Sequence, residues 1–141
     1  MPLTPDPLEL EPLVRQLYAA LAAGDRAALL ALLAPEFHAH FAPGLPFGVG
    51  GDHDGAEAAI TDGWWELGRR YRMRAEPEEW IPVGDGRLIV RGTYRGSARA
   101  TGTDVKAEFI HVWGGADGRL TSVRQLTDTV QWTQALTPNL F

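Results

Sequence analysis

One histidine in the second half of the sequence has the surroundings of a group that moves protons. Strict alternation over residues 104–113 predicts a strand whose Lys106 and Glu108 face solvent. His111 then lies on the inward face with four apolar residues: Val105, Ala107, Phe109 and Trp113. Such a histidine is either a core residue bonded to a backbone carbonyl or an acid/base group that burial keeps neutral, and both interpretations stay open.

A carboxylate near the end of the predicted last strand, Asp128, is the second candidate. If it points into an apolar cavity, desolvation raises its pKa and suits it to proton transfer. Otherwise it caps a turn or pairs with an arginine, and both faces of strand 119–131 are too mixed to decide. A hairpin register that places His111 opposite Thr121 would separate the two candidates by roughly 23 Å, at ~3.3 Å per residue.

Two further histidines, His38 and His40, share one face of a predicted strand at residues 37–41, with the i, i+2 spacing that can chelate a metal ion. A third ligand would have to come from residues 52–54, and this spacing fits no metal motif. We therefore predict histidines that bind no metal. The absence of cysteine from the 141 residues also excludes disulfides, thiolate metal centres and a cysteine nucleophile.

The elements that must position these groups begin with helices. A first helix is predicted from residues 6–7, with a restart at Pro12, and a second begins at the cap residue Asp25. A capping box at residues 54–57 opens a third helix, in which Gly63 predicts a closely packed neighbour.

From residue 72 onward the hydrophobic period switches to two. Strands joined by glycine-rich turns are predicted near residues 72–81, 87–99, 104–113 and 119–131. Helices followed by antiparallel strands predict one α+β domain over residues 1–141. A strongly bent sheet of this kind can wrap around the helices and enclose a conical cavity, with Gly92 and Gly96 at the bend.

The formal net charge of −5 argues against a general nucleic-acid-binding protein, although eight of the 13 basic residues fall within residues 69–99. Arg91, Arg95 and Arg99 recur on one strand face without interleaved aromatic residues, which is typical of a solvated outer sheet face or of a subunit interface laced with ion pairs. No apolar run approaches the ~20 residues of a membrane span, and the first residues lack the features of a signal peptide. We therefore expect a cytoplasmic protein without nucleic-acid or membrane partners.

Three segments carry a further signal: LYAALAAGD at residues 17–25, PGLPFG at residues 43–48, and GRL at residues 118–120 leading to QLTDT at residues 125–129. With the order of elements, they resemble the SnoaL-like polyketide cyclases of the nuclear transport factor 2-like superfamily. The resemblance implies a cone-shaped α+β barrel, with three N-terminal helices packed in a strongly curved, mainly antiparallel sheet. It also implies acid/base catalysis in an apolar cone without metal or organic cofactor, and a homodimer formed through the outer sheet face.

Within that resemblance, Asp128 falls where SnoaL-like cyclases have their acid/base aspartate. Ketosteroid isomerases share the fold, but their catalytic tyrosine and two aspartates would fall on Leu17, Phe41 or Ala42, and Ile110 or Phe109. Tyr18 is adjacent to the first of these positions and is expected to point elsewhere. The sequence therefore argues against ketosteroid isomerisation.

We expect a pocket for a small apolar molecule that performs cofactor-independent acid/base chemistry on an oxygenated, polyketide-like ring compound, as a cyclase, isomerase or hydroxylase-like enzyme. Asp128 and His111 are the expected catalytic residues. The expected substrate-binding residues are Arg124, Gln125, Trp64, Tyr94, Phe109, Trp113 and Phe47, the last on a glycine-rich loop that is either a lid or tucked under its own side chains. Two alternatives stay open: a non-catalytic ligand-binding or accessory domain, and an epoxide hydrolase, which would need a second inward carboxylate.

Overall fold

The computed structural model describes residues 7–138, with side chains from residue 9 onward. Its elements are, in order, α1 (Pro7–Ala23), α2 (Arg26–Leu32), β1 (Leu33–Phe41), β2 (Gly51–Asp54), α3 (Ala56–Ala58), the π-helix η1 (Ala59–Trp64), α4 (Trp65–Arg70), β3 (Tyr71–Val83), β4 (Arg87–Ala98), β5 (Asp104–Ala116), β6 (Arg119–Thr127) and α5 (Thr129–Gln134). Asp6, part of the predicted start of the first helix, lies outside the described residues.

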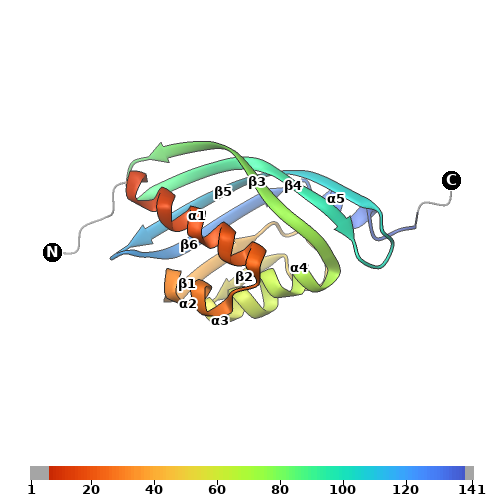
Figure 1. Cartoon of the computed structure of the whole chain (residues 1–141), viewed down its shortest axis with the longest axis horizontal. Helices are drawn as coiled ribbons and strands as arrows, with labels where there is room; N and C mark the ends of the chain where they lie inside the picture. The colour runs from red at the N-terminus through yellow and green to blue at the C-terminus, as the bar shows by residue number, and fades with distance from the viewer. Residues whose placement is uncertain (1–6, 139–141) are drawn as a thin grey trace.

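The six strands form one sheet in the order β2-β1-β6-β5-β4-β3. All neighbouring pairs are antiparallel except β1 and β6, which run parallel. Figure 1 shows β3 rising from the end of α4 and arching over α1, so that the curved sheet holds the helices on its concave side. The predicted α+β cone is confirmed, but the sheet is not closed, because β2 and β3 are its two edges.

Helix α1 supplies the inner layer of the core. Leu10, Val14 and Leu17 follow one another at helical spacing and are fully buried. The predicted restart at Pro12 was wrong, since α1 continues through this residue. Proline removes only one hydrogen bond near the start of the helix, and packing of the apolar stripe compensates for it. Neither α1 nor any other helix within residues 7–138 is long and apolar enough to cross a membrane.

The third helical segment, α3-η1-α4, is one continuous run whose middle is wound as a π-helix. It starts after Gly55 without a side-chain cap, so the predicted capping box was wrong. The Asp54 carboxylate bonds instead to a histidine of β1. A Cβ on Gly63 would collide with the ring of Phe41, so the predicted close neighbour is confirmed.

The hairpin between β5 and β6 sets the register of the site. Its two turn residues, Asp117 and Gly118, have φ angles of 54° and 78°, as a two-residue turn of type I′ requires. The strands therefore pair right up to this turn, and His111 pairs with Gln125. The predicted partner, Thr121, was wrong, because the turn is centred on residues 117–118 and not on residue 116, and the register shifts between Gly114 and Gly115.

Strand β6 ends at Thr127, before the predicted end at residue 131, and α5 follows it. Trp132 of α5 is buried, and its ring centroid lies 5.0 Å from that of Tyr71 and 5.1 Å from that of Tyr94. This helix therefore packs against the inner face of the sheet, where the sequence suggested a continuing strand.

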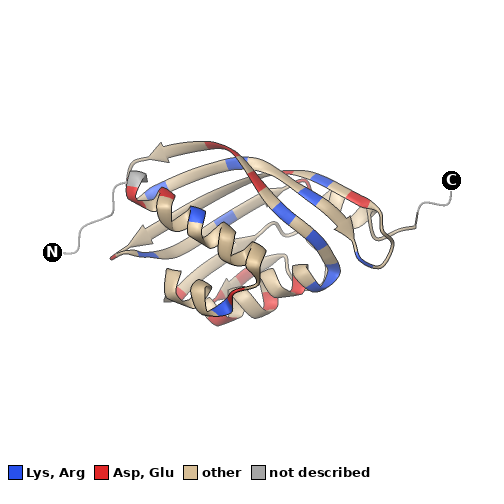
Figure 2. Cartoon of the chain, in the orientation of Figure 1, with Lys and Arg blue, Asp and Glu red and all other residues tan. Residues whose placement is uncertain are grey.

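The outer face of β3 and β4 carries two of the three arginines that the sequence singled out, whereas Arg99 lies just beyond β4 and donates to the Gly68 carbonyl at 3.0 Å. Arg91 pairs with Glu78 at 3.4 Å and with Glu79 at 2.9 Å. Arg95 pairs with Glu76 at 2.9 Å. Figure 2 shows basic and acidic residues interspersed along these strands. These exposed ion pairs within the chain fit the solvated outer sheet face that the sequence suggested.

Candidate functional site

An aromatic cavity of about 180 Å³ lies between α1, the η1–α4 segment and the concave side of the sheet. The aromatic part of its wall consists of Phe41, Trp64, Trp65, Tyr71, Trp113 and Trp132. Four neutral polar side chains interrupt this wall, Tyr18, Tyr94, His111 and Gln125, and the charged residue Arg74 also borders the cavity. Among the described residues that line the cavity there is no aspartate or glutamate. The cavity can therefore take up a flat apolar molecule and offer it a few neutral polar contacts.

The polar set is centred on His111. Its side chain is buried, and the ring of Phe109 stacks on it at a centroid distance of 4.2 Å. The Nδ1 atom of His111 lies 2.7 Å from the hydroxyl oxygen of Tyr18, and its Nε2 atom lies 2.5 Å from the hydroxyl oxygen of Tyr94. Burial lowers the pKa of His111 to about 3, so the ring is neutral at physiological pH.

Each of the two tyrosine oxygens also accepts one hydrogen bond from a residue other than His111. Trp113 Nε1 donates to Tyr18 across 3.3 Å, and Gln125 Nε2 donates to Tyr94 across 2.8 Å. Desolvation by burial raises the pKa of both tyrosines far above its usual value, so both hydroxyls stay protonated. A wholly neutral chain of hydrogen bonds therefore runs along the cavity wall.

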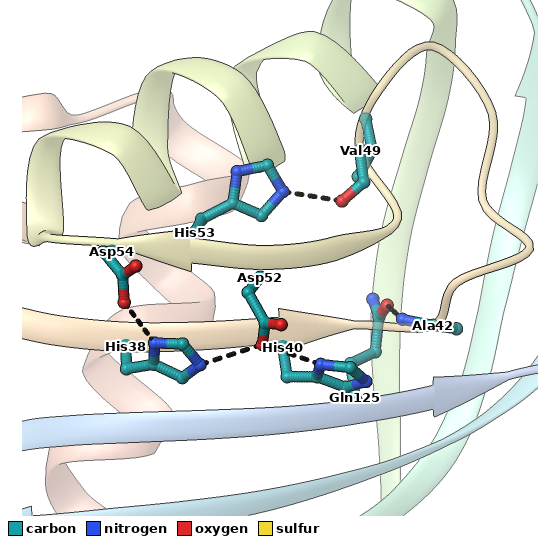
Figure 3. Close-up of polar contacts among 8 residues, drawn as sticks. All are labelled: His38, His40, Ala42, Val49, Asp52, His53, Asp54 and Gln125. Atoms are coloured by element: carbon teal, nitrogen blue, oxygen red, sulfur yellow. Dashed lines mark hydrogen bonds and ion pairs between the residues drawn. The ribbon is translucent and has the colours of Figure 1, made fainter.

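Gln125 anchors that chain to the neighbouring strand. Its Oε1 accepts the backbone N–H of Ala42 at 3.3 Å, just beyond the end of β1 (Figure 3). Because the amide oxygen is used there, the amide nitrogen of Gln125 faces Tyr94. The parallel pairing of β1 with β6 thus orients a donor toward the site.

Tyr18 was expected to point away from the pocket, and this expectation was wrong. Its neighbour Leu17 is fully buried in the core, and the ~100° step between consecutive helix residues turns Tyr18 toward the cavity. The sequence did carry a signal, because Tyr18 follows the buried Val14 by four residues on α1.

Asp128 does not reach the cavity. It is exposed and occupies the N-cap position of α5, where its side chain makes no capping hydrogen bond. Val123 and Gln125 line the cavity, so the odd-numbered residues of β6 face inward, and the chain leaves the sheet directly after Thr127. The expectation of an inward carboxylate at Asp128 was therefore wrong. Arg124 is exposed on the outer face for the same reason, so its expected contact with substrate was wrong too.

Phe47 also lies outside the cavity, contrary to expectation. It is 39% exposed, and the guanidinium of Arg70 lies 4.2 Å from the centre of its ring. Of the other expected substrate-binding residues, the structure places four on the cavity wall: Gln125, Trp64, Tyr94 and Trp113. Phe109 supports the ring of His111 instead of lining the cavity. The wall residue Trp132 was not foreseen, because the sequence suggested strand where α5 forms.

A second polar group lies on β1 and β2, on the face of β1 opposite the buried Ala39 and Phe41. Its cross-strand pairs join His38 Nδ1 to Asp54 at 2.6 Å, His38 Nε2 to Asp52 at 3.0 Å, and His40 Nδ1 to Asp52 at 2.9 Å (Figure 3). The hydrogen bond to Asp54 is the main cause that raises the pKa of His38. Within the part of the chain that the structure describes, no three His, Cys, Asp or Glu side chains are arranged to hold a metal ion.

Comparison with models of protein families identifies the family of this chain. The sequence model of the SnoaL-like domain matches residues 14–123. The chain belongs to the SnoaL-like domain family. The resemblance found in the sequence, to the SnoaL-like group within the nuclear transport factor 2-like superfamily, is thereby confirmed. A search of curated proteins found no match.

Solved structures similar to this SnoaL-like chain cover nearly its whole length. A nuclear transport factor 2-like protein of unknown function from Burkholderia pseudomallei K96243 is 30% identical, with a TM-score of 0.82, over 92% of this chain and 98% of that chain. TerC, co-crystallised with polyporic acid, is 26% identical, with a TM-score of 0.80, over 91% and 98% of the two chains. IdmH from Streptomyces antibioticus, provisionally described as a polyketide cyclase, is 21% identical, with a TM-score of 0.74, over 89% and 96%, and supports the fold alone.

Proposed function

We propose that this SnoaL-like protein binds a small, apolar, oxygen-bearing ring compound of polyketide type and acts on it by cofactor-independent proton transfer. The observation that carries the proposal is a neutral His111 held between the hydroxyls of Tyr18 and Tyr94 on the wall of an aromatic cavity. The catalytic role expected of His111 is kept, and the two tyrosines share it by contacting the ligand. Asp128 takes no part, because it is exposed outside the cavity.

The tyrosine hydroxyls would act on an oxygen atom of the ligand. A hydroxyl that donates to a ligand carbonyl stabilises the negative charge that develops on that oxygen when an enolate forms. Such a bond is stronger in a site that excludes water, because the local dielectric is low. The reaction class that fits is enolisation: one tyrosine gives its proton to the ligand carbonyl and receives the proton of His111, while the other tyrosine gives its proton to His111 and takes the α-proton of the ligand. Isomerisation or ring closure follows, and no redox step is needed.

The cavity walls favour a flat ligand. The rings of Trp64 and Trp113 lie with their centroids 6.5 Å apart and their planes 29° from parallel. Aromatic side chains offer large, rigid contact areas to other rings. Among the similar structures, TerC was crystallised with a small organic molecule, polyporic acid, which supports a ligand of related size here.

Binding without turnover is a second candidate, and one specific observation favours it. An efficient general base has a pKa near the working pH, whereas the pKa of His111 is about 3. The same hydroxyls would then only orient the ligand. Epoxide hydrolysis has no such support, because no carboxylate lines the cavity among the residues that the structure describes.

The implied homodimer through the outer sheet face is part of the proposal. On that face, Ile110 of β5 and Leu126 of β6 are paired directly and are 39% and 49% exposed. An apolar pair of this kind within a polar face supports a contact with a second copy.

A ligand screen followed by variants tests the function. Thermal-shift and tryptophan-fluorescence titrations with cyclic ketones, hydroxyquinones and polyporic acid find a ligand, and mass spectrometry finds any product. We expect His111→Gln to keep binding within several-fold and to lose about a hundredfold or more in turnover, whereas Asp128→Asn keeps both. Binding without conversion by the wild type would leave the second candidate, and the absence of any ligand would contradict both.

A further inference from the structure

The hydrogen-bond donors and acceptors of His111, Tyr18 and Tyr94 determine how protons are shared along the cavity wall. A neutral histidine carries one N–H donor and one acceptor nitrogen. His111 faces a tyrosine hydroxyl at each nitrogen, so it donates a hydrogen bond to one tyrosine oxygen and accepts a hydrogen bond from the other hydroxyl. Tyr18 and Tyr94 therefore play opposite roles toward the same ring.

The other neighbours of Tyr18 and Tyr94 leave one tyrosine hydroxyl proton without an acceptor. Trp113 and Gln125 present only N–H donors to the tyrosine oxygens, because an indole nitrogen cannot accept and the Gln125 oxygen already accepts from Ala42. The tyrosine that accepts from His111 thus keeps an O–H for which the described residues supply no acceptor. Since both tyrosines line the cavity, that proton is available to a ligand.

Two arrangements of the protons satisfy these hydrogen bonds, and Tyr18 and Tyr94 exchange roles between them. In one, Tyr94 donates to His111 Nε2, and His111 Nδ1 donates to Tyr18, which keeps the free proton. In the other arrangement, Tyr18 donates to His111 Nδ1, and His111 Nε2 donates to Tyr94, which keeps the free proton. The free hydroxyl is a strong donor in both cases, because its oxygen accepts two N–H bonds. The chain thus offers a donor at one end and an acceptor at the other.

We propose that the ligand is a conjugated ring carbonyl with its own mobile proton at the far end of the conjugated system, that is, a vinylogous acid or amide. Its carbonyl oxygen accepts the free proton of one tyrosine, and its O–H or N–H donates to the oxygen of the other. This inference rests on the proposed function and narrows its ligand class. A simple ketone would leave one end of the chain without a partner.

The same contacts let the ligand change its tautomer. With the carbonyl at Tyr18, this residue gives its proton to the carbonyl oxygen and receives the proton of His111 Nδ1. His111 Nε2 takes the proton of Tyr94, and Tyr94 takes the mobile proton of the ligand. One O–H bond forms on the ligand, one O–H or N–H bond breaks, and the double bonds shift between the two ends. No atom gains a net charge, so a histidine that stays neutral is sufficient.

A matched pair of quinolones tests the ligand class. 4-Quinolone has a carbonyl and an N–H at opposite ends of one conjugated ring, and N-methyl-4-quinolone lacks only that proton. In calorimetric titrations of the full chain we expect 4-quinolone to bind about tenfold more tightly than its N-methyl analogue, as for a lost hydrogen bond that leaves a buried group unpaired.

Three variants test which tyrosines cause the tighter binding of 4-quinolone. In Tyr18→Phe and in Tyr94→Phe, the ratio of the two affinities should fall below about threefold, because one end of the chain is missing. Tyr71→Phe is the matched control, since Tyr71 also lines the cavity but its hydroxyl already donates to the Trp132 carbonyl at 2.8 Å. Its ratio should match that of the wild type.

Equal affinities of the wild type for the two quinolones would overturn the proposal, as would an unchanged ratio in both tyrosine variants. Naphthalene, which makes no hydrogen bonds to the site, separates this outcome from failure of the proposed function. If naphthalene and N-methyl-4-quinolone bind while the preference is absent, the cavity function stands and the ligand class falls. If none of the three compounds binds, both fall. The affinities of the wild type for the two quinolones test the proposal on their own, so the test remains valid even if a variant fails to fold.

Discussion

Burial and complete hydrogen bonding act together on His111. Both of its nitrogens have tyrosine partners, so the neutral ring leaves no polar atom unpaired. A further proton would bring a positive charge into a wall where the described lining holds no carboxylate to pair with it. This environment explains why the pKa of His111 lies at about 3.

The free energy of unfolding should therefore fall in acid. The pKa of His111 drops from 6.5 to about 3 on folding, so the unfolded chain takes up this proton first. The contribution is fully present above pH 6.5 and is lost as the pH falls toward 3, on the order of a few kcal/mol in total. Thermal melting from pH 3 to 8 should show a shallower acid decline for His111→Gln than for the wild type. Parallel curves would contradict this account.

His38 should respond in the opposite direction. Its hydrogen bond to Asp54 is the main cause that raises its pKa, so the folded chain keeps this proton above pH 6.5. The stabilisation is present below pH 6.5 and is lost as the pH rises through the raised pKa. The side chain is 43% exposed, so solvent screening keeps the effect on stability small. An NMR titration of the imidazole is the sharper measurement, and a pKa at or below 6.5 would refute the pairing.

Among single residues, the sequence predicted some placements and missed others for identifiable reasons. His111 could be placed inward because Lys106 and Glu108 mark the opposite face of its strand. Asp128 could not be placed, since the alternation continues past the residue at which the chain leaves the sheet. The contact between Tyr18 and His111 joins residues far apart in the chain, and no local pattern encodes such a pair.

At the level of elements, glycine sets how closely the η1 segment approaches β1. Gly63→Ala should destabilise the fold by about 1–3 kcal/mol, because its Cβ would overlap the ring of the buried Phe41. Gly68→Ala on the neighbouring α4 is the matched control. No atom lies within 4 Å of its added Cβ, so alanine should stabilise that helix by about 0.5–1 kcal/mol. Urea unfolding of both variants measures the difference, and equal midpoints would exclude the close contact.

Two elements, β2 and α5, escaped prediction because tertiary contacts create them. The segment GDHD at residues 51–54 has no apolar alternation and becomes a strand by pairing with β1, where its aspartates meet His38 and His40. The segment TVQWTQ at residues 129–134 alternates like a strand but is held as a helix by the burial of Trp132. Propensity is a weak guide where packing of this kind decides.

At the level of the whole molecule, the two faces of the sheet carry different features. The concave face holds the helices and the cavity, and the outer face carries ion pairs and the exposed apolar pair of Ile110 and Leu126. The order of helices and strands predicted the α+β class, and the resemblance to the SnoaL-like group implied the strongly curved sheet. The open edges and the parallel β1–β6 pair were not encoded in any single segment.

The outer face also makes the proposed homodimer testable. Replacing both Ile110 and Leu126 by lysine should convert the dimer to a monomer, because four like charges would face one another across the symmetric contact. Light scattering coupled to size-exclusion chromatography reports the mass. Glu57→Lys, on the exposed side of α3, is the control and should leave the mass unchanged. A monomeric wild type, or a dimer that survives the double change, would exclude this face.

The π-helix η1 has a consequence for how such a cavity can be retuned. A π-turn holds one residue more than an α-turn, so the loss of one amino acid from residues 59–64 would let this stretch close as a plain α-helix. The residues of that turn would then face new directions beside Trp64 and Trp65, which line the cavity. The loss of one codon in this short stretch of the gene would therefore reshape the binding chamber in a single step.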